Sequence, residues 1–156
     1  MSICRGIAGR RGKNPVGIFI HNGADSQNAT SEYYKNYLQR ANLENGFAHY
    51  YVCSDGILQA ENDSNCAWHC GDLNGNLNFL GIEVCQSMGD LNVFKANEEK
   101  ALQLAAQKCK HDHAASGGIF IICKNIIGYC YLVARTGSSL HQCGIYLSGI
   151  PCHIKR

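Results

Sequence analysis

The stretch FIHNGADSQNATSEYYKNYLQ, residues 19–39, joins the end of an apolar run to a helix-like segment through a polar, glycine-containing loop. The run VGIFIH, residues 16–21, is β-branched and aromatic and follows Pro15, a pattern that predicts a buried strand. It ends at His21, so an imidazole lies where the strand meets the loop. His21 is either an ordinary strand-end residue or one part of a site whose other members come from elsewhere in the chain.

The rest of the chain up to Lys110 alternates between helical and strand-like patterns. The predicted elements are a helix over residues 31–46, a hairpin over 47–60, a strand over 79–87 and a helix over 96–111. Asn45-Gly46 supplies an end for the first helix, and Asn97 is a candidate cap for the second. Ser54-Asp55-Gly56 is a favourable hairpin turn. This order predicts an α/β domain with helices packed on a central sheet.

Length and composition narrow the class of protein. The 156 residues suit one domain, and 46% hydrophobic with 17% charged residues provide a core. A net charge of +2 gives no reason to expect nucleic acid as a partner, and no run reaches the roughly 18 apolar residues of a membrane span. The four basic residues near the start are interpreted as a solvated lead-in rather than a patch for an anionic polymer. They are Arg5, Arg10, Arg11 and Lys13.

The first residues and the cysteine content indicate the cellular compartment in which the chain is made. Residues 1–14 contain no apolar segment typical of a secretory signal, which predicts synthesis in a cytoplasm without export by that route. Ten cysteines occur without any CxxC pair. In that context most of them are predicted to be small, buried and reduced rather than part of a disulfide framework.

Polar residues on otherwise apolar strands are the candidates for chemistry. Glu83 lies in LGIEVC, where a charged carboxylate is costly unless it is paired or functional. The alternative is a strand-end carboxylate that faces solvent. His21 and His49 lie on the other two strand-like runs. Imidazoles at strand ends can hold zinc with one position open for water, and a nearby carboxylate can then act as general base.

A long polar loop, residues 61–78, contains the pair Trp68-His69. Loops of this length in compact domains are often functional, so the pair is a candidate for binding a ligand. The alternative is that Trp68 fills part of the core from the loop.

Taken together, three stretches resemble zinc-dependent N-acetylmuramoyl-L-alanine amidases of the peptidoglycan-recognition-protein type, in particular those of phage endolysins. They are IFIHNGADSQNATSEYYKNYL, GFAHYYVCSDGILQAENDSNCAWHCGD and NFLGIEVCQSMGDLNVFKANEEKALQLAAQ. The resemblance runs from about Gly12 to Lys110 of a single predicted domain, residues 1–156. It implies a mixed central β-sheet flanked by helices. It also implies hydrolysis of the amide between N-acetylmuramic acid and the L-alanine of the stem peptide.

The resemblance also implies a role for each candidate. His21 matches the first zinc ligand, and Glu83 matches the acid that activates the zinc-bound water. Trp68 and His69 match the loop that lines the substrate groove, and His49 matches a histidine beside the site, which is assigned to substrate binding. The implied partner is bacterial peptidoglycan. A chain without a secretory signal would reach the wall after release from the host cytoplasm, for instance through a holin pore.

Residues 111–156 depart from the family pattern, which places a His, seven intervening residues and then Cys or Asp. Here His141 is followed by Cys143 and Cys152, neither at that distance. One interpretation is a divergent ending that still brings His141 and Cys152 to His21 as zinc ligands. The other is a non-homologous ending, such as a shifted reading frame, with an incomplete zinc site. The function is then either a peptidoglycan amidase, a peptidoglycan-binding module without hydrolysis, or a relic without a ligand.

Overall fold

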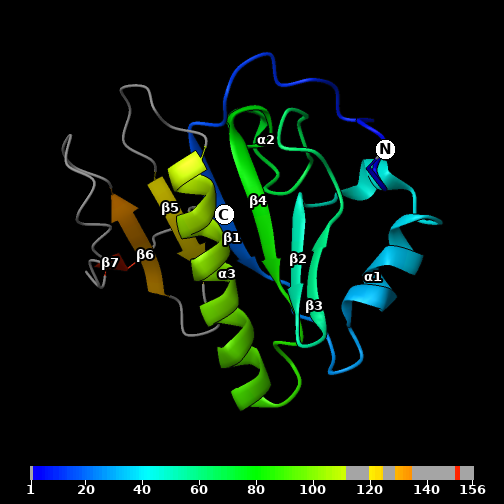
Figure 1. The fold of residues 1–156 in the computed structure, drawn as a ribbon, viewed down its shortest axis with the longest axis vertical. Coiled ribbons are helices and arrows are strands. Elements are labelled where there is room, and N and C mark those ends of the chain that lie inside the picture. Colours follow the sequence, from blue (N-terminus) through cyan, green and yellow to red (C-terminus); the bar gives the residue numbers. More distant parts are fainter. Residues whose placement is uncertain (1, 112–119, 125–128, 135–149, 152–156) are drawn as a thin grey trace.

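The computed structural model describes residues 2–111, 120–124, 129–134 and 150–151, with side chains through residue 108. These residues contain a seven-stranded sheet in the order β3-β2-β4-β1-β5-β6-β7 (Figure 1). The strands are β1 Gly17–Asn22, β2 Tyr50–Cys53, β3 Gly56–Gln59, β4 Phe79–Val84, β5 Phe120–Lys124, β6 Tyr129–Ala134 and β7 Ile150–Pro151. The helices are α1 Ser31–Leu38, the 3-10 turn η1 Leu43–Asn45, α2 Leu73–Asn78 and α3 Leu91–His111.

The sheet is mixed. Strand β1 pairs in parallel with both β4 and β5, and β2 pairs in parallel with β4. Strands β2 and β3 form the antiparallel hairpin that the turn residues predict, and β5, β6 and β7 pair antiparallel. The predicted α/β fold with a mixed central sheet is therefore confirmed. Within the described part of the chain, no helix combines the length and the apolar character that a membrane crossing needs.

Two clusters of buried side chains lie on opposite faces of the sheet, because successive residues of a strand point to opposite sides. Tyr50 and Val52 of β2 pack in the cluster that also contains Phe94 and Leu104 of α3. Tyr51 and Cys53 of the same strand join the other cluster, to which α1 contributes Leu38. Figure 1 shows α3 lying across one face, while α1 lies near the β2–β3 hairpin. The row of site residues described below lies on the α1 side.

The first helix is shorter than predicted. Helix α1 begins after Thr30, whose hydroxyl accepts the N–H of Tyr33, and ends at Leu38. A separate 3-10 turn, η1, follows because the Asn42 side chain accepts the N–H of Glu44 and starts a new helical segment. The predicted helix over residues 31–46 is thus two segments. Likewise, the predicted loop over 61–78 contains α2, which Asp72 caps through the N–H of Gly75.

The prediction that Asn97 caps the last helix is wrong. Helix α3 begins at Leu91, and the Asp90 carboxylate accepts the N–H groups of Asn92 and Val93. Asn97 is fully buried inside the helix, where its amide donates to the carbonyl of Cys85 and to the side chain of Gln86. It ties α3 to the end of β4 instead of starting the helix. The sequence pattern that predicts a helix start at Asn97 therefore does not mark the start of α3.

The described thiols behave as the composition predicts. Cys4, Cys53, Cys66 and Cys85 are buried and free, and Cys70 is partly exposed. Burial raises the pKa of the Cys4 thiol to about 12, with the negative charge of Glu61 adding to the effect. Burial is therefore as predicted for Cys4, Cys53, Cys66 and Cys85, and their reduced state stays a prediction.

Candidate active site

A row of three side chains crosses the sheet at the carboxyl ends of parallel strands. The register pairs His21 of β1 with Glu83 of β4, and Glu83 with Tyr51 of β2. Residues paired in this way project from the same face of a sheet. The two strand-end residues singled out in the sequence, 62 positions apart, are therefore neighbours.

Gly81 makes room beside this row for a third residue. A Cβ at Gly81 would lie 2.5 Å from Cγ of His69, so only a glycine lets the His69 ring pack against β4. Nε2 of His69 lies 3.3 Å from the carbonyl of Phe79, and Nδ1 lies 3.0 Å from Nε2 of His21. We infer that His69 Nε2 donates to the carbonyl and that His21 donates to Nδ1. In a neutral His21 the ring lone pair is then on Nδ1.

His69 is neutral at physiological pH. Burial lowers its pKa to about 3, and the nearby imidazoles of His21 and His49 act in the same direction. A second positive charge beside His21 would repel a cation, so the neutral form of His69 suits a site that binds one. Sequence analysis identified His69 but not Gly81, although the glycine of the GIE motif was a usable signal.

Glu83 has the environment of a functional carboxylate. Its Oε2 atom is buried and has no hydrogen-bond partner among the described residues. Burial raises its pKa to about 8, and the negative charge of Asp25 adds to the shift. A carboxyl group that binds a proton near neutral pH is suited to accept and return protons. The side chain as a whole is partly exposed, because it also lines a groove that opens to solvent.

Glu83 faces a groove with a volume of about 740 Å³. Trp68 and His69 line one part of it, and the tyrosines of α1 line another. The remaining lining comes mainly from the β1–α1 loop and residues 45–48. Trp68 is partly buried and meets Phe47 edge-on, with ring centroids 5.7 Å apart. Trp68 packs on the core and also borders the groove, so its contact with a ligand stays a prediction.

Asp25 joins the two loops that form the rim of the groove. Its Oδ2 accepts the hydroxyl of Tyr34 at 2.5 Å, and its Oδ1 accepts the backbone N–H groups of Gln86 and Ser87. The loop after β1 is therefore tied to the loop after β4 and to α1. Sequence analysis missed Asp25. The only feature of the local sequence that points to Asp25 is its place as an acidic residue in the loop after His21.

His49 lies beneath the site rather than in the groove. It is fully buried, and its Nδ1 accepts the N–H of Gly81 at 3.0 Å. A neutral ring then carries its proton on Nε2, which lies 3.1 Å from the carbonyl of Asn65. The predicted contact of His49 with substrate stays a prediction, and its location favours a structural role.

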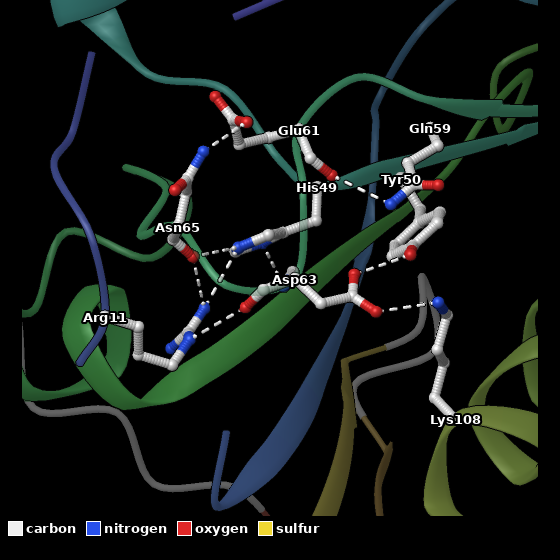
Figure 2. A network of polar contacts seen from close by, with 9 residues as sticks. Arg11, His49, Tyr50, Gln59, Glu61, Asp63, Asn65 and Lys108 are labelled. Atoms are coloured by element: carbon white, nitrogen blue, oxygen red, sulfur yellow. Dashed lines mark hydrogen bonds and ion pairs between the residues drawn. The ribbon is translucent and has the colours of Figure 1, made fainter. Parts of the chain in front are cut away.

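Arg11 completes this buried network (Figure 2). Its guanidinium donates to four backbone carbonyls, those of Asp63, Asn65, Leu77 and Phe79, at 2.7–3.2 Å. Arg11 is only 8% exposed, so the interpretation of the basic residues as a solvated lead-in is wrong for this one. Its neighbours Arg5, Arg10 and Lys13 are exposed. Nothing in the local sequence separates Arg11 from them, because the four carbonyls that it contacts lie more than 50 residues away.

The described residues match one part of a zinc site. His21 offers an imidazole beside a buried carboxylate oxygen that has no partner among the described residues, and both groups suit a divalent cation in kind. Among residues with described side chains, no group of three His, Cys, Asp or Glu could hold a metal ion. The predicted ligands His141 and Cys152 lie outside the described residues, so their roles stay predictions.

Comparison with known proteins identifies the family of this chain and similar structures. Residues 11–128 match the family model of N-acetylmuramoyl-L-alanine amidase, Amidase_2. Over 105 residues the chain is 42% identical to endolysin PlyTW of Staphylococcus phage Twort, and over 110 residues it is 40% identical to endolysin LysK of Staphylococcus phage K. Each match covers 65% of this chain and 22% of the relative. The structure of PlyL is similar, with a TM-score of 0.57 and 28% identity over 63% of this chain and 61% of that one.

The chain belongs to the N-acetylmuramoyl-L-alanine amidase family, which confirms the resemblance found in the sequence. It spans about a fifth of the length of the endolysins that it matches. The family match continues past Lys110 to residue 128.

The buried network yields a stability prediction. Arg11→Ala should lower the free energy of unfolding by about 3 kcal/mol, because it leaves several buried carbonyls without a charged donor. Arg10→Ala, one residue earlier and exposed, should change it by less than about 0.5 kcal/mol. Urea denaturation followed by circular dichroism measures both. Equal effects of the two substitutions would contradict the assigned role of Arg11.

A second prediction concerns pH. Burial lowers the pKa of His49 to about 4 in the folded protein, with Arg11 opposing protonation and the Asn65 carbonyl, Asp63 and Glu61 favouring it. Because an unfolded His titrates near 6.5, the stability contributed by neutral His49 is complete above that pH and is lost as pH falls toward 4. Lowering the pH from 7 to 5 should therefore reduce the contribution of His49 to the free energy of unfolding by about 2 kcal/mol.

Comparison with His49→Gln isolates this contribution. The variant should be less stable than the parent at pH 7, because it changes the acceptor for the Gly81 N–H. It should nevertheless lose about 2 kcal/mol less on acidification to pH 5, since it removes one group that titrates. Denaturant unfolding of both proteins at the two pH values is the measurement. Parallel losses in parent and variant would show that His49 does not titrate in this way.

Proposed function

We propose that this chain is a peptidoglycan hydrolase domain that cleaves the amide between the lactyl group of N-acetylmuramic acid and the L-alanine of the stem peptide. Membership of the amidase family supports the reaction class. The observation that carries the proposal is Glu83, which faces a groove beside His21 and has one buried oxygen without a partner among the described residues. The matched endolysins support cell-wall peptidoglycan as the substrate.

In the proposed reaction, Glu83 acts as general base and then as general acid. It accepts a proton from the attacking water as the water oxygen bonds to the amide carbon. It returns the proton to the alanine nitrogen as the carbon–nitrogen bond breaks, so the products are a carboxylic acid and an amine. His69 and Gly81 act indirectly, since the His69 ring against Gly81 orients the His21 imidazole.

Zinc is the proposed cofactor, with His21 as one ligand and His141 and Cys152 as the other two. When bound, zinc polarises the amide carbonyl and lowers the pKa of a bound water. The neutral state of the neighbouring His69 favours the binding of a cation at His21. Trp68, on the border of the groove, is the proposed contact for the glycan–peptide substrate.

The proposed setting is a phage infection. The protein would be made in the bacterial cytoplasm and would act on the wall after release, for which a holin is the proposed partner. The similarity to two phage endolysins supports this setting.

Substitution of the proposed general base tests the mechanism. Glu83→Gln should lower the rate of release of wall peptides roughly 10²–10⁴-fold. The reason is that the glutamine side chain cannot accept the proton of the attacking water. Its unfolding curve and zinc content should match those of the parent. The matched control is Glu44→Gln, which changes an exposed glutamate in η1 and should keep full activity. Turnover of purified cell walls by Glu83→Gln at the parent rate would refute the assignment.

Metal analysis tests the proposed ligands. The purified protein should contain about one zinc per chain, and His21→Ala and Cys152→Ser should each lose most of it, because catalytic zinc sites usually have three protein ligands. His111→Ala, at the end of α3, is the control and should keep the metal.

The second candidate is a peptidoglycan-binding module without hydrolysis. The departure of His141, Cys143 and Cys152 from the family spacing favours it. Zinc well below one per chain, together with muropeptide binding and no release of wall peptides, would establish this alternative.

A further inference from the structure

A pair of tyrosines on α1 separates the groove from a second cavity. Tyr33 and Tyr37 are 50% and 48% exposed although they are large aromatic residues. Their ring planes lie within 6° of parallel, with centroids 6.1 Å apart. Tyr34, on the same helix, instead packs inward on Tyr51, with ring centroids 4.2 Å apart. The core therefore does not require Tyr33 and Tyr37, and their exposure needs another explanation.

The second cavity borders the groove at α1. It has a volume of about 410 Å³ and is lined by Tyr33, Asn36, Tyr37, Arg40 and Ala41. Tyr33 and Tyr37 line the groove that contains Glu83 as well. The two cavities therefore meet at the tyrosine pair, and a chain-like ligand that extends from Glu83 past this pair would reach the second cavity.

We propose that the second cavity is a subsite for the glycan strand, where a pyranose ring of an N-acetylated sugar packs on the Tyr33–Tyr37 pair. This inference rests on the proposed function, because it extends the substrate that the groove would bind. Sugar rings have flat faces of C–H groups that suit parallel aromatic rings, while their hydroxyl and acetamido groups need polar partners at the edge.

Arg40 provides such a partner. Its Nε–H already donates to the carbonyl of Asn36 at 3.1 Å, which fixes the guanidinium at the side of the cavity. Arginine has five donors, so further N–H groups remain on the same plane to meet sugar oxygens. The lining contains no carboxylate, which agrees with an uncharged sugar as the occupant.

The test uses a tetramer of β-1,4-linked N-acetylglucosamine, which has no stem peptide and no bond that the proposed reaction cleaves. Isothermal titration calorimetry measures its affinity for the whole protein. Tyr37→Ala and Arg40→Gln should each weaken binding roughly threefold to tenfold, the range expected for losing one aromatic or one charged hydrogen-bonding contact. Lys35→Gln is the matched control for Arg40, since it changes an exposed cation of α1 that lines neither cavity, and it should bind like the parent.

The outcomes separate this inference from the proposed function. Glu83→Gln should bind the tetramer like the parent, because the subsite does not use the carboxylate. No saturable binding by the parent, or equal binding by the parent and Tyr37→Ala, would overturn the subsite while leaving hydrolysis unaffected. A loss in Tyr37→Ala without any loss in Arg40→Gln would also overturn it, because the sugar would then occupy the main groove. Absence of wall hydrolysis, with tetramer binding that depends on both residues, would support the subsite and reject the amidase.

Discussion

The close approach of two imidazoles to Gly81 is the constraint on which the site depends. His69 occupies the space that a side chain at this position would fill, and His49 accepts the N–H of the same residue from within the sheet. His69 then contacts His21 at 3.0 Å. A larger residue in the middle of β4 would displace His69 and remove its contact with the ring nitrogen of His21. The absence of a side chain at Gly81 therefore determines where the imidazoles of the site lie.

Around this point, parallel pairing places the chemical groups and the loops hold them. Strands β1, β4 and β2 end at the same edge of the sheet, so His21 and Glu83 meet although they are distant in the chain. Asp25 then ties the loop after β1 to the start of the segment after β4. It also raises the pKa of Glu83 through its negative charge, as a second cause after burial. One carboxylate thus supports both the shape of the rim and the proton affinity of the candidate base.

The polar residues of this chain divide into two groups with different roles. Those beneath the sheet edge, Arg11 and His49, are satisfied by backbone groups and contribute stability. Glu83, at the groove, has an oxygen with no described partner, which is costly for the fold and typical of a functional site. On α1 the exposed tyrosine pair likewise contributes little to the core. Stability and proposed substrate contact are therefore assigned to different sets of residues.

The sequence alone determined the elements and the most informative residues, because hydrophobic alternation, turn residues and a lone carboxylate on an apolar strand are local signals. It predicted β1, the β2–β3 hairpin and β4, and it singled out His21 and Glu83 as candidates for the site. Only the tertiary structure decided the contacts of Asp25, the burial of Arg11, and the position of Asn97 inside α3 rather than at its start. It also decided which tyrosines of α1 face outward. Each of these depends on partners that the sheet register brings together from distant segments, and no pattern within a window of neighbouring residues records them.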